Sequence, residues 1–140
     1  MEETSLSTMI IIVCIIASIV IAIKVGNVFD EKYPNLQPYK WGFFQGWVGL
    51  LTGGVLTILM LINPLLLFSD LKLSEDEGFR IFVTVFMAVY MSIMAIACLF
   101  IIKRKRWGWI VATILSLNPI LWVVNGIYLK NRWKELSTSS

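Results

Sequence analysis

Four long apolar stretches constrain what this chain can fold into more than any other feature of its sequence. They cover residues 6–25, 41–68, 79–102 and 107–129. The charged residues within them are Lys24 and Arg80, each close to the end of its stretch. The hydrocarbon core of a bilayer is about 30 Å thick, and about 20 mostly apolar residues cross it as an α-helix. Each stretch is therefore long enough for one crossing.

A water-soluble bundle of four buried helices is the alternative, and the composition argues against it. Hydrophobic residues make up 58% of the 140-residue chain, charged residues make up 15%, and the mean hydropathy is +0.80. The segments outside the four stretches are too short to cover so much apolar surface in water. The first stretch also lacks the basic start and the small-residue cleavage site of a signal peptide, so we interpret it as a retained anchor.

The short connections between the stretches force each helix to run antiparallel to the next. We therefore predict an all-α membrane protein with four antiparallel transmembrane helices in a compact bundle. Residues 1–140 form a single integral membrane domain in this interpretation, and about 135–140 form a disordered tail because they are polar and terminal. The expected location is the cell membrane, plasma or inner.

The distribution of basic residues predicts an orientation. Seven lie on one side: Lys24, Lys32, Lys40, Lys103, Arg104, Lys105 and Arg106. Five lie on the other: Lys72, Arg80, Lys130, Arg132 and Lys134. Because cytoplasmic loops carry an excess of Lys and Arg, loops 26–40 and 103–106 are expected in the cytoplasm and both termini outside.

The second stretch carries a stripe of small residues. It consists of Gly42, Gly46, Gly49, Gly53 and Thr57, at offsets of three or four. Two GxxxG units in register let helix backbones approach closely, which is a main source of helix association in lipid. Two interpretations stay open: packing inside this chain's own bundle, or an interface with another chain.

Two Asn-Pro pairs interrupt apolar stretches, Asn63-Pro64 late in the second and Asn118-Pro119 in the fourth. Each proline removes a helical hydrogen bond, so a kink or local opening is expected at both places. The asparagines, together with Asn125, are positioned to form a buried polar cluster. A structural role is the first interpretation, and the second is a transporter site built from broken helices.

The run Lys103, Arg104, Lys105 and Arg106 lies between the third and fourth stretches. Basic side chains at a membrane surface attract anionic lipid head groups. We expect these four residues to contact such head groups and to act as a topology determinant. The net charge of +3 lies in the loops and suits an anionic membrane surface; no nucleic-acid partner is expected.

The residues needed for most catalysis are missing. The chain has no histidine, which excludes a His-Glu-x-x-His metal site and a Ser-His pair. Ser74 and Glu77 have the spacing of a capping box at the start of the third stretch, which accounts for the acids there better than a cation site does. Cys14 and Cys98 fall inside spans, where they are expected to pack as small apolar residues. We predict no enzyme activity, no metal and no cofactor.

Two functional hypotheses remain. The first is a non-catalytic interaction or accessory protein that binds another membrane protein, motivated by the glycine stripe and the missing chemistry. The alternative is a small homo-oligomeric transporter, channel or pore for a neutral or lipid-like substrate, motivated by the Asn-Pro breaks.

Overall fold

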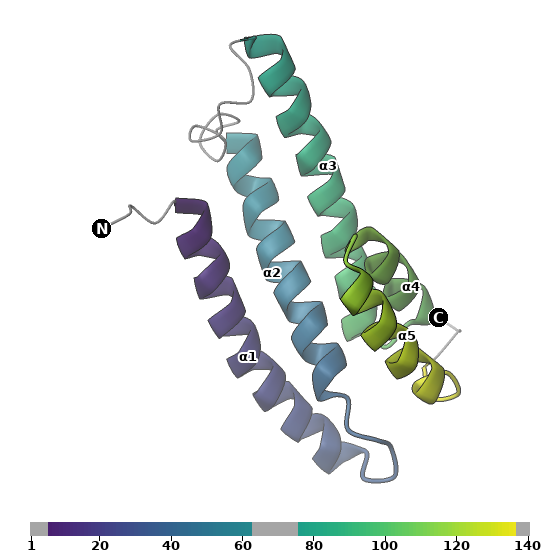
Figure 1. Cartoon of the computed structure of the whole chain (residues 1–140). Helices are drawn as coiled ribbons and strands as arrows, with labels where there is room; N and C mark the ends of the chain where they lie inside the picture. Colours follow the sequence, from purple (N-terminus) through teal and green to yellow (C-terminus); the bar gives the residue numbers. More distant parts are fainter. Residues whose placement is uncertain (1–5, 63–75, 137–140) are drawn as a thin grey trace.

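The computed structural model describes residues 6–62 and 76–136, and every element in these two ranges is helical (Figure 1). The helices are α1 (Leu6–Lys32), α2 (Lys40–Ile62), α3 (Glu77–Ile102), α4 (Arg106–Leu115) and α5 (Pro119–Arg132). The expectation of an all-helical chain is confirmed for the described residues. Three of the helices, α1, α2 and α3, are long and apolar enough to cross a membrane.

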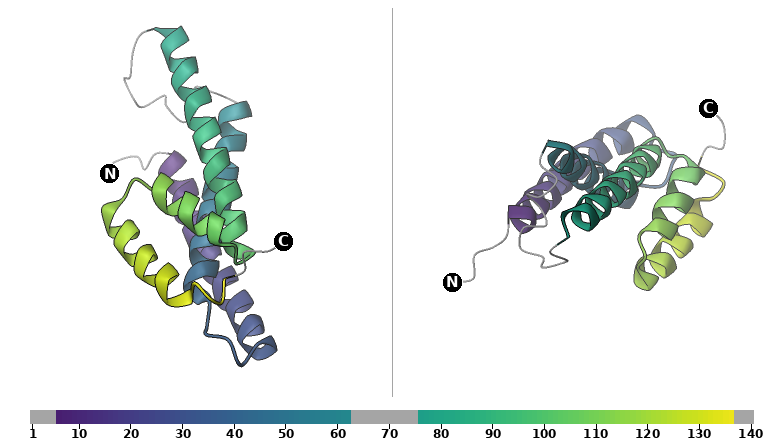
Figure 2. Two further views of the ribbon diagram at one scale, coloured as in Figure 1. Left: turned by 90° about the vertical axis from the view of Figure 1, so that its right-hand side faces the viewer. Right: turned by 90° about the horizontal axis from the view of Figure 1, so that it is seen from above.

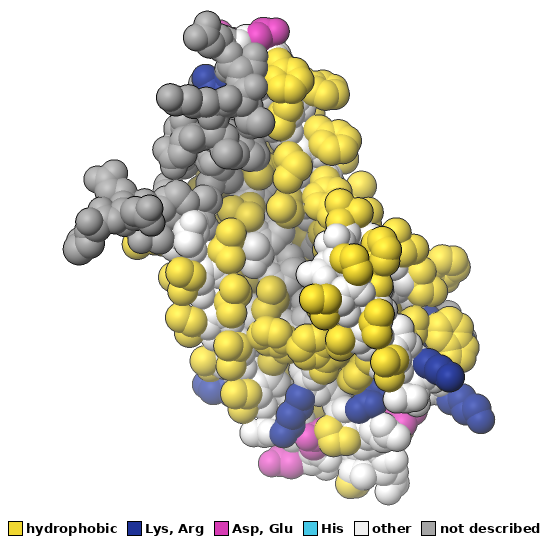
Figure 3. Space-filling model, in the orientation of Figure 1, with side chains coloured by type: hydrophobic (Ala, Val, Ile, Leu, Met, Phe, Trp, Pro, Cys, Tyr) yellow, Lys and Arg dark blue, Asp and Glu magenta, His cyan; other side chains and the backbone are white. Residues whose placement is uncertain are grey.

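These three helices form a layer with α2 between α1 and α3, and neighbours run antiparallel (Figure 1). Their outer faces are rich in exposed apolar side chains, such as Val13 and Ile16 on α1 and Phe86 and Val89 on α3. A water-soluble protein of this size does not expose apolar surface so widely. The outer surface of the layer is therefore suited to lipid, as Figure 3 shows for one face.

Helix α3 begins at an acidic cap. The side chain of Asp76 accepts a hydrogen bond from the backbone N–H of Gly78 at 2.9 Å. Asp76 thus satisfies one of the free amides of the first turn. The N-cap in the structure is Asp76, whereas the sequence indicated Ser74, which lies outside the described residues.

The fourth apolar stretch differs from the expectation. It contains two short helices, α4 and α5, separated by Ser116, Leu117 and Asn118. Leu117 has a positive φ of 49°, and Asn118 caps α5 by accepting from the N–H groups of Ile120 (3.0 Å) and Leu121 (3.3 Å). The Asn-Pro pair therefore ends one helix and starts a new one, whereas a kink would have preserved the direction.

Helices α4 and α5 run side by side as a hairpin that folds back toward its own starting end (Figures 1 and 2). With 10 residues, α4 is about 15 Å long, half of the hydrocarbon core. The expected single helix over 107–129 is therefore not present, and a fourth crossing is not confirmed.

The hairpin returns the chain to the end of the layer where α1 meets α2. Arg106 Nε donates to the carbonyl of Trp133 at 2.9 Å, and an Arg104 nitrogen lies 4.0 Å from a Glu135 carboxylate oxygen. Leu136, which the sequence placed in the frayed tail, is fully buried. The described chain thus begins and ends at opposite ends of the layer, whereas the expected arrangement has both termini on one side.

Candidate functional site

The largest buried cluster lies at the end of the layer where the hairpin is anchored, and Tyr39 is at its centre. The Tyr39 side chain has no exposed surface. Its hydroxyl accepts a hydrogen bond from Trp109 Nε1 at 2.6 Å and donates one to the carbonyl oxygen of Ile101 at 2.9 Å. One side chain of the α1–α2 loop thereby joins the end of α3 to α4.

The local sequence explains how Tyr39 reaches this position. It lies between Pro38 and Lys40, the first residue of α2. A Cβ atom on Gly42 would lie only 2.3 Å from the Tyr39 ring, so a glycine one turn later leaves the space that the ring occupies. Burial raises the pKa of the Tyr39 phenol, and the hydrogen bond from Trp109 partly opposes that effect.

Two arginines close this cluster. The guanidinium of Arg104 lies 4.8 Å from the ring centre of Phe29 and 5.3 Å from that of Tyr39. Arg132 lies 4.3 Å from the ring centre of Tyr128 and donates to the carbonyl of Pro38 at 2.7 Å. Cations over aromatic faces are attracted by the ring quadrupole, so Arg104 fastens the α3–α4 turn to α1 and to the α1–α2 loop. Arg132 fastens α5 to the same loop through its hydrogen bond to Pro38.

This arrangement gives different surroundings to the four residues predicted to contact lipid head groups, Lys103, Arg104, Lys105 and Arg106. Arg104 has a positive φ of 59° and directs its guanidinium to the aromatic cluster, while Arg106 lies 4.5 Å from the ring centre of Trp133. Lys103 is exposed and Lys105 is half-buried. Lys103 is thus the member of the set most open to a lipid head group.

A second set of polar contacts joins the hairpin to α2. Trp41 Nε1 donates to Asn125 Oδ1 at 3.3 Å, and Asn125 Nδ2 donates to Thr113 Oγ1 at 3.2 Å. Asn125 is 1% exposed. Asn118, the other described member of the expected polar cluster, caps α5 at the exposed tip instead, while Asn63 and Pro64 lie outside the described residues.

The glycine stripe lies mainly against α3 of the same chain. A Cβ on Gly46 would approach Ile102, and one on Gly53 would approach the Met91 carbonyl. A Cβ on Gly49 would lie 2.1 Å from the Cys98 sulfur. Gly42 faces Tyr39, as described above. Thr57 has a buried hydroxyl without a hydrogen-bond partner among the described residues. The close approach that the stripe permits is therefore used by α2 and α3.

The tip of the α4–α5 hairpin is an exposed break between two helices. Leu117 and Ile120 are 73% and 74% exposed. The Tyr90 hydroxyl of α3 donates to the carbonyl of Leu115, and Ser116 Oγ donates to that of Thr113 at 2.7 Å. Both bonds satisfy carbonyls at the end of α4, while the apolar side chains of the tip have no cover.

Charge is strongly segregated between the two ends of the layer. Every described Lys and Arg except Arg80 lies toward the end that holds the aromatic cluster: Lys24, Lys32, Lys40, Lys103, Arg104, Lys105, Arg106, Lys130, Arg132 and Lys134. Arg80 lies in the first turn of α3, at the other end. Figure 3 shows several of these basic side chains gathered at the lower edge of the apolar face. We call this the basic end.

The described residues contain no group of three or more His, Cys, Asp or Glu side chains that could hold a metal ion. Comparison with protein-family models, with curated proteins and with solved structures finds no match. Geometry is thus the basis for a functional proposal.

The Tyr39 cluster was not singled out from the sequence, although Gly42, two residues into α2, is a signal of a side chain packed on the helix start.

Proposed function

We propose that the protein crosses the membrane three times, through α1, α2 and α3, and that α4 and α5 form a re-entrant hairpin. Two observations support this topology. Both ends of the hairpin are bound at the basic end, through Arg106 and Arg132, and α4 is too short to span the core. With the basic end in the cytoplasm, the N-terminus is outside and the C-terminus inside.

On this topology, we propose that the protein is a non-catalytic interaction subunit that binds another membrane protein at its hairpin tip. The observation that carries the proposal is the exposed tip. Irregular backbone at membrane depth is tolerated where protein buries it or where it lines a water-filled cavity. In the single chain Leu117 and Ile120 have neither kind of cover, so a protein surface over the tip would remove the conflict.

A homo-oligomeric transporter or pore for a neutral substrate is the second candidate. The specific observation in its favour is the polar side chains near the tip: Tyr90, Ser116 and Thr52 all line one cavity of about 320 Å³. Broken helices that meet near the midplane are the usual site architecture of small transporters. In this case the tips of several copies would cover one another.

Site-specific photo-crosslinking in native membranes tests the proposal. The crosslinking residue replaces Ile120 at the tip, and the matched control replaces Ile16, an exposed apolar residue of α1. A protein adduct formed from position 120 and absent from position 16 supports an interaction subunit. Adducts between copies of this chain support the oligomeric alternative instead, and lipid adducts alone from position 120 would refute both.

A further inference from the structure

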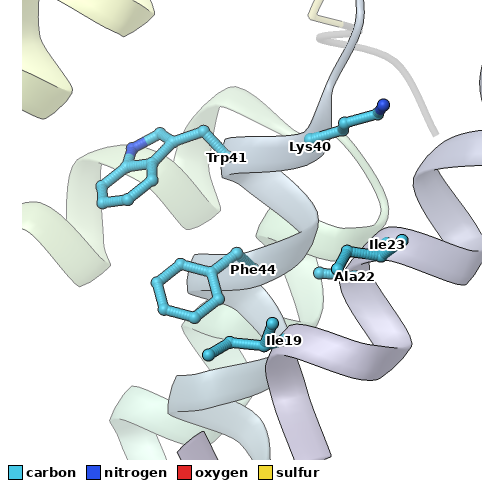
Figure 4. A pocket seen from close by; sticks show the side chains of 6 residues that line it. All are labelled: Ile19, Ala22, Ile23, Lys40, Trp41 and Phe44. Carbon is cyan, nitrogen blue, oxygen red and sulfur yellow. The ribbon is translucent and has the colours of Figure 1, made fainter. Parts of the chain in front are cut away.

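Two cavities lie in succession along α1 and α2, and together we call them the groove. The first, of about 290 Å³, is lined by Ile19, Ala22 and Ile23 of α1 and by Lys40, Trp41 and Phe44 of α2 (Figure 4). The second is the cavity of about 320 Å³ near the hairpin tip. Both use the same face of the two helices, because Ile15 follows Ile19 and Val48 follows Phe44 at one-turn spacing.

The groove has the dimensions of a lipid tail. From Lys40 to Gly53, the α2 residues that line it span about 20 Å at 1.5 Å per residue. One leaflet contributes about half of the ~30 Å core, or about 15 Å, so an acyl chain that enters at the basic end lies along about three quarters of the groove. The lining of the first cavity is mainly apolar; such a hollow does not retain water, and an empty one forfeits the packing contacts of its lining.

A basic side chain, Lys40, lies at the open end of the groove. The side chain of Lys40 is 55% exposed, with its Nζ 3.7 Å from a carboxylate oxygen of Asp30. Its stem crosses Gly26 of α1, where a Cβ would lie 2.9 Å from Lys40 Cγ. Ion pairs as exposed as this one are weak, so a lipid phosphate can replace Asp30. Trp41, beside Lys40, is a residue type that favours the membrane interface.

We propose that this groove binds one anionic phospholipid, with an acyl chain along Ile19, Phe44 and Val48 and the phosphate at Lys40. The site is separate from the turn that contains Lys103, since Lys40 and the groove belong to α1 and α2. Ser116 of the hairpin lines the second cavity, whereas Leu117 and Ile120, where the proposed partner would bind, line neither. The first cavity has no hairpin residue in its lining, so changes there test the lipid site apart from the proposed partner.

Native mass spectrometry of the full chain, reconstituted in vesicles of equal phosphatidylglycerol and phosphatidylcholine, tests the head-group end. One retained phosphatidylglycerol per chain is expected. Lys40→Gln lowers the ratio of retained phosphatidylglycerol to phosphatidylcholine about fivefold, the factor for one basic side chain at about 1 kcal/mol. The control Lys134→Gln, on an exposed side chain that lines neither cavity, leaves the ratio unchanged. Equal retention of both lipids by the wild type, or equal loss in both variants, would overturn the placement of the phosphate.

Filling the groove tests the acyl-chain end. Ile19→Trp places a large side chain in the first cavity and should remove the retained lipid, whereas Val13→Trp on the outward face of α1 should not. Lipid retained equally by both variants contradicts the proposal. If Ile19→Trp does not fold, a labelling experiment on the wild type tests the same point. Phosphatidylglycerol with a diazirine in its acyl chain should label the α1 and α2 residues of the groove. Labelling confined to outward-facing residues such as Val13 would overturn the site.

Discussion

Replacing Tyr39 by Phe should loosen the attachment of the hairpin to the helix layer. The change removes one oxygen from a fully buried side chain and leaves its ring in place. Trp109 Nε1, now 2.6 Å from the hydroxyl, loses its acceptor. The Ile101 carbonyl, now 2.9 Å from the hydroxyl, loses one of its donors and keeps the backbone N–H of Arg104 at 2.9 Å. A buried polar group left without a partner costs about 1–3 kcal/mol. Trp109 Nε1 is one such group, so the expected loss is about 1–3 kcal/mol, or about fivefold and more in the folding equilibrium.

The assay is unfolding of the purified chain in mixed micelles by increasing SDS, followed by far-ultraviolet circular dichroism. Trypsin cleavage near Arg132 reports opening of the hairpin in the same samples, and Tyr39→Phe should accelerate it. Tyr33→Phe is the matched control, because Tyr33 lies in the same loop and is 42% exposed; its effect should stay within about 0.5 kcal/mol. If Tyr39→Phe is as stable as Tyr33→Phe, the two hydrogen bonds do not hold the hairpin.

Three further predictions follow from the same arrangement. A reporter fused after Ser140 should be active on the cytoplasmic side of the membrane, the side that also exposes a tag inserted in loop 33–39; opposite sides would contradict the re-entrant hairpin. Gly49→Ala should destabilise the α2–α3 pair by about 1–3 kcal/mol, because the added Cβ overpacks against Cys98. The control is Gly54→Ala, whose added Cβ meets no atom within 4 Å; it should be neutral or stabilise the protein by up to about 1 kcal/mol. SDS titration of the two variants compares their stabilities. Burial raises the pKa of Tyr39 above its ordinary 10.0, so the contribution of this phenol to stability is complete below about pH 10 and is lost as the pH rises further. The SDS midpoint of the wild type should therefore fall above that pH. In Tyr39→Phe the SDS midpoint should depend less on pH.

The three long helices were predictable because their cause is local. Continuous apolar sequence of sufficient length determines both the helix and its lipid-facing character, and α1, α2 and α3 follow from it. Their ends were less predictable. Helix α1 continues to Lys32, seven residues past the expected end, because Gly26 and Asn27 are tolerated inside a helix that packs against α2.

The glycine stripe shows a different limit. Its spacing predicted a face of close approach; Gly46 and Gly53 face backbone atoms of α3, and Gly49 faces the side chain of Cys98. The spacing did not predict which helix would pack against this face, because a glycine only leaves space and does not specify which residue fills it. Cys98 and Ala95 of α3 provide the complementary surface, and neither has a sequence signal that points to α2.

The fourth stretch could not be resolved from sequence for a physical reason. An apolar run of its length fits one crossing or two half-length helices equally well, and Pro119 suits both a kink and the first turn of a new helix. The contacts that decide between them are long-range: Trp41 with Asn125, and Arg132 with the loop at Pro38. No local window of sequence contains both partners.

The distribution of basic residues along the chain also favours a re-entrant hairpin over a fourth crossing. Four crossings divide the basic residues seven against five, a bias too small to favour one orientation firmly. A returning hairpin moves Lys130, Arg132 and Lys134 to the side of the two basic loops, and the division becomes ten against two, with Lys72 and Arg80 alone opposite. Membrane insertion favours a large excess of basic residues on the cytoplasmic side. The rule for orientation and the contacts at Trp133 and Pro38 thus favour the same path for the chain.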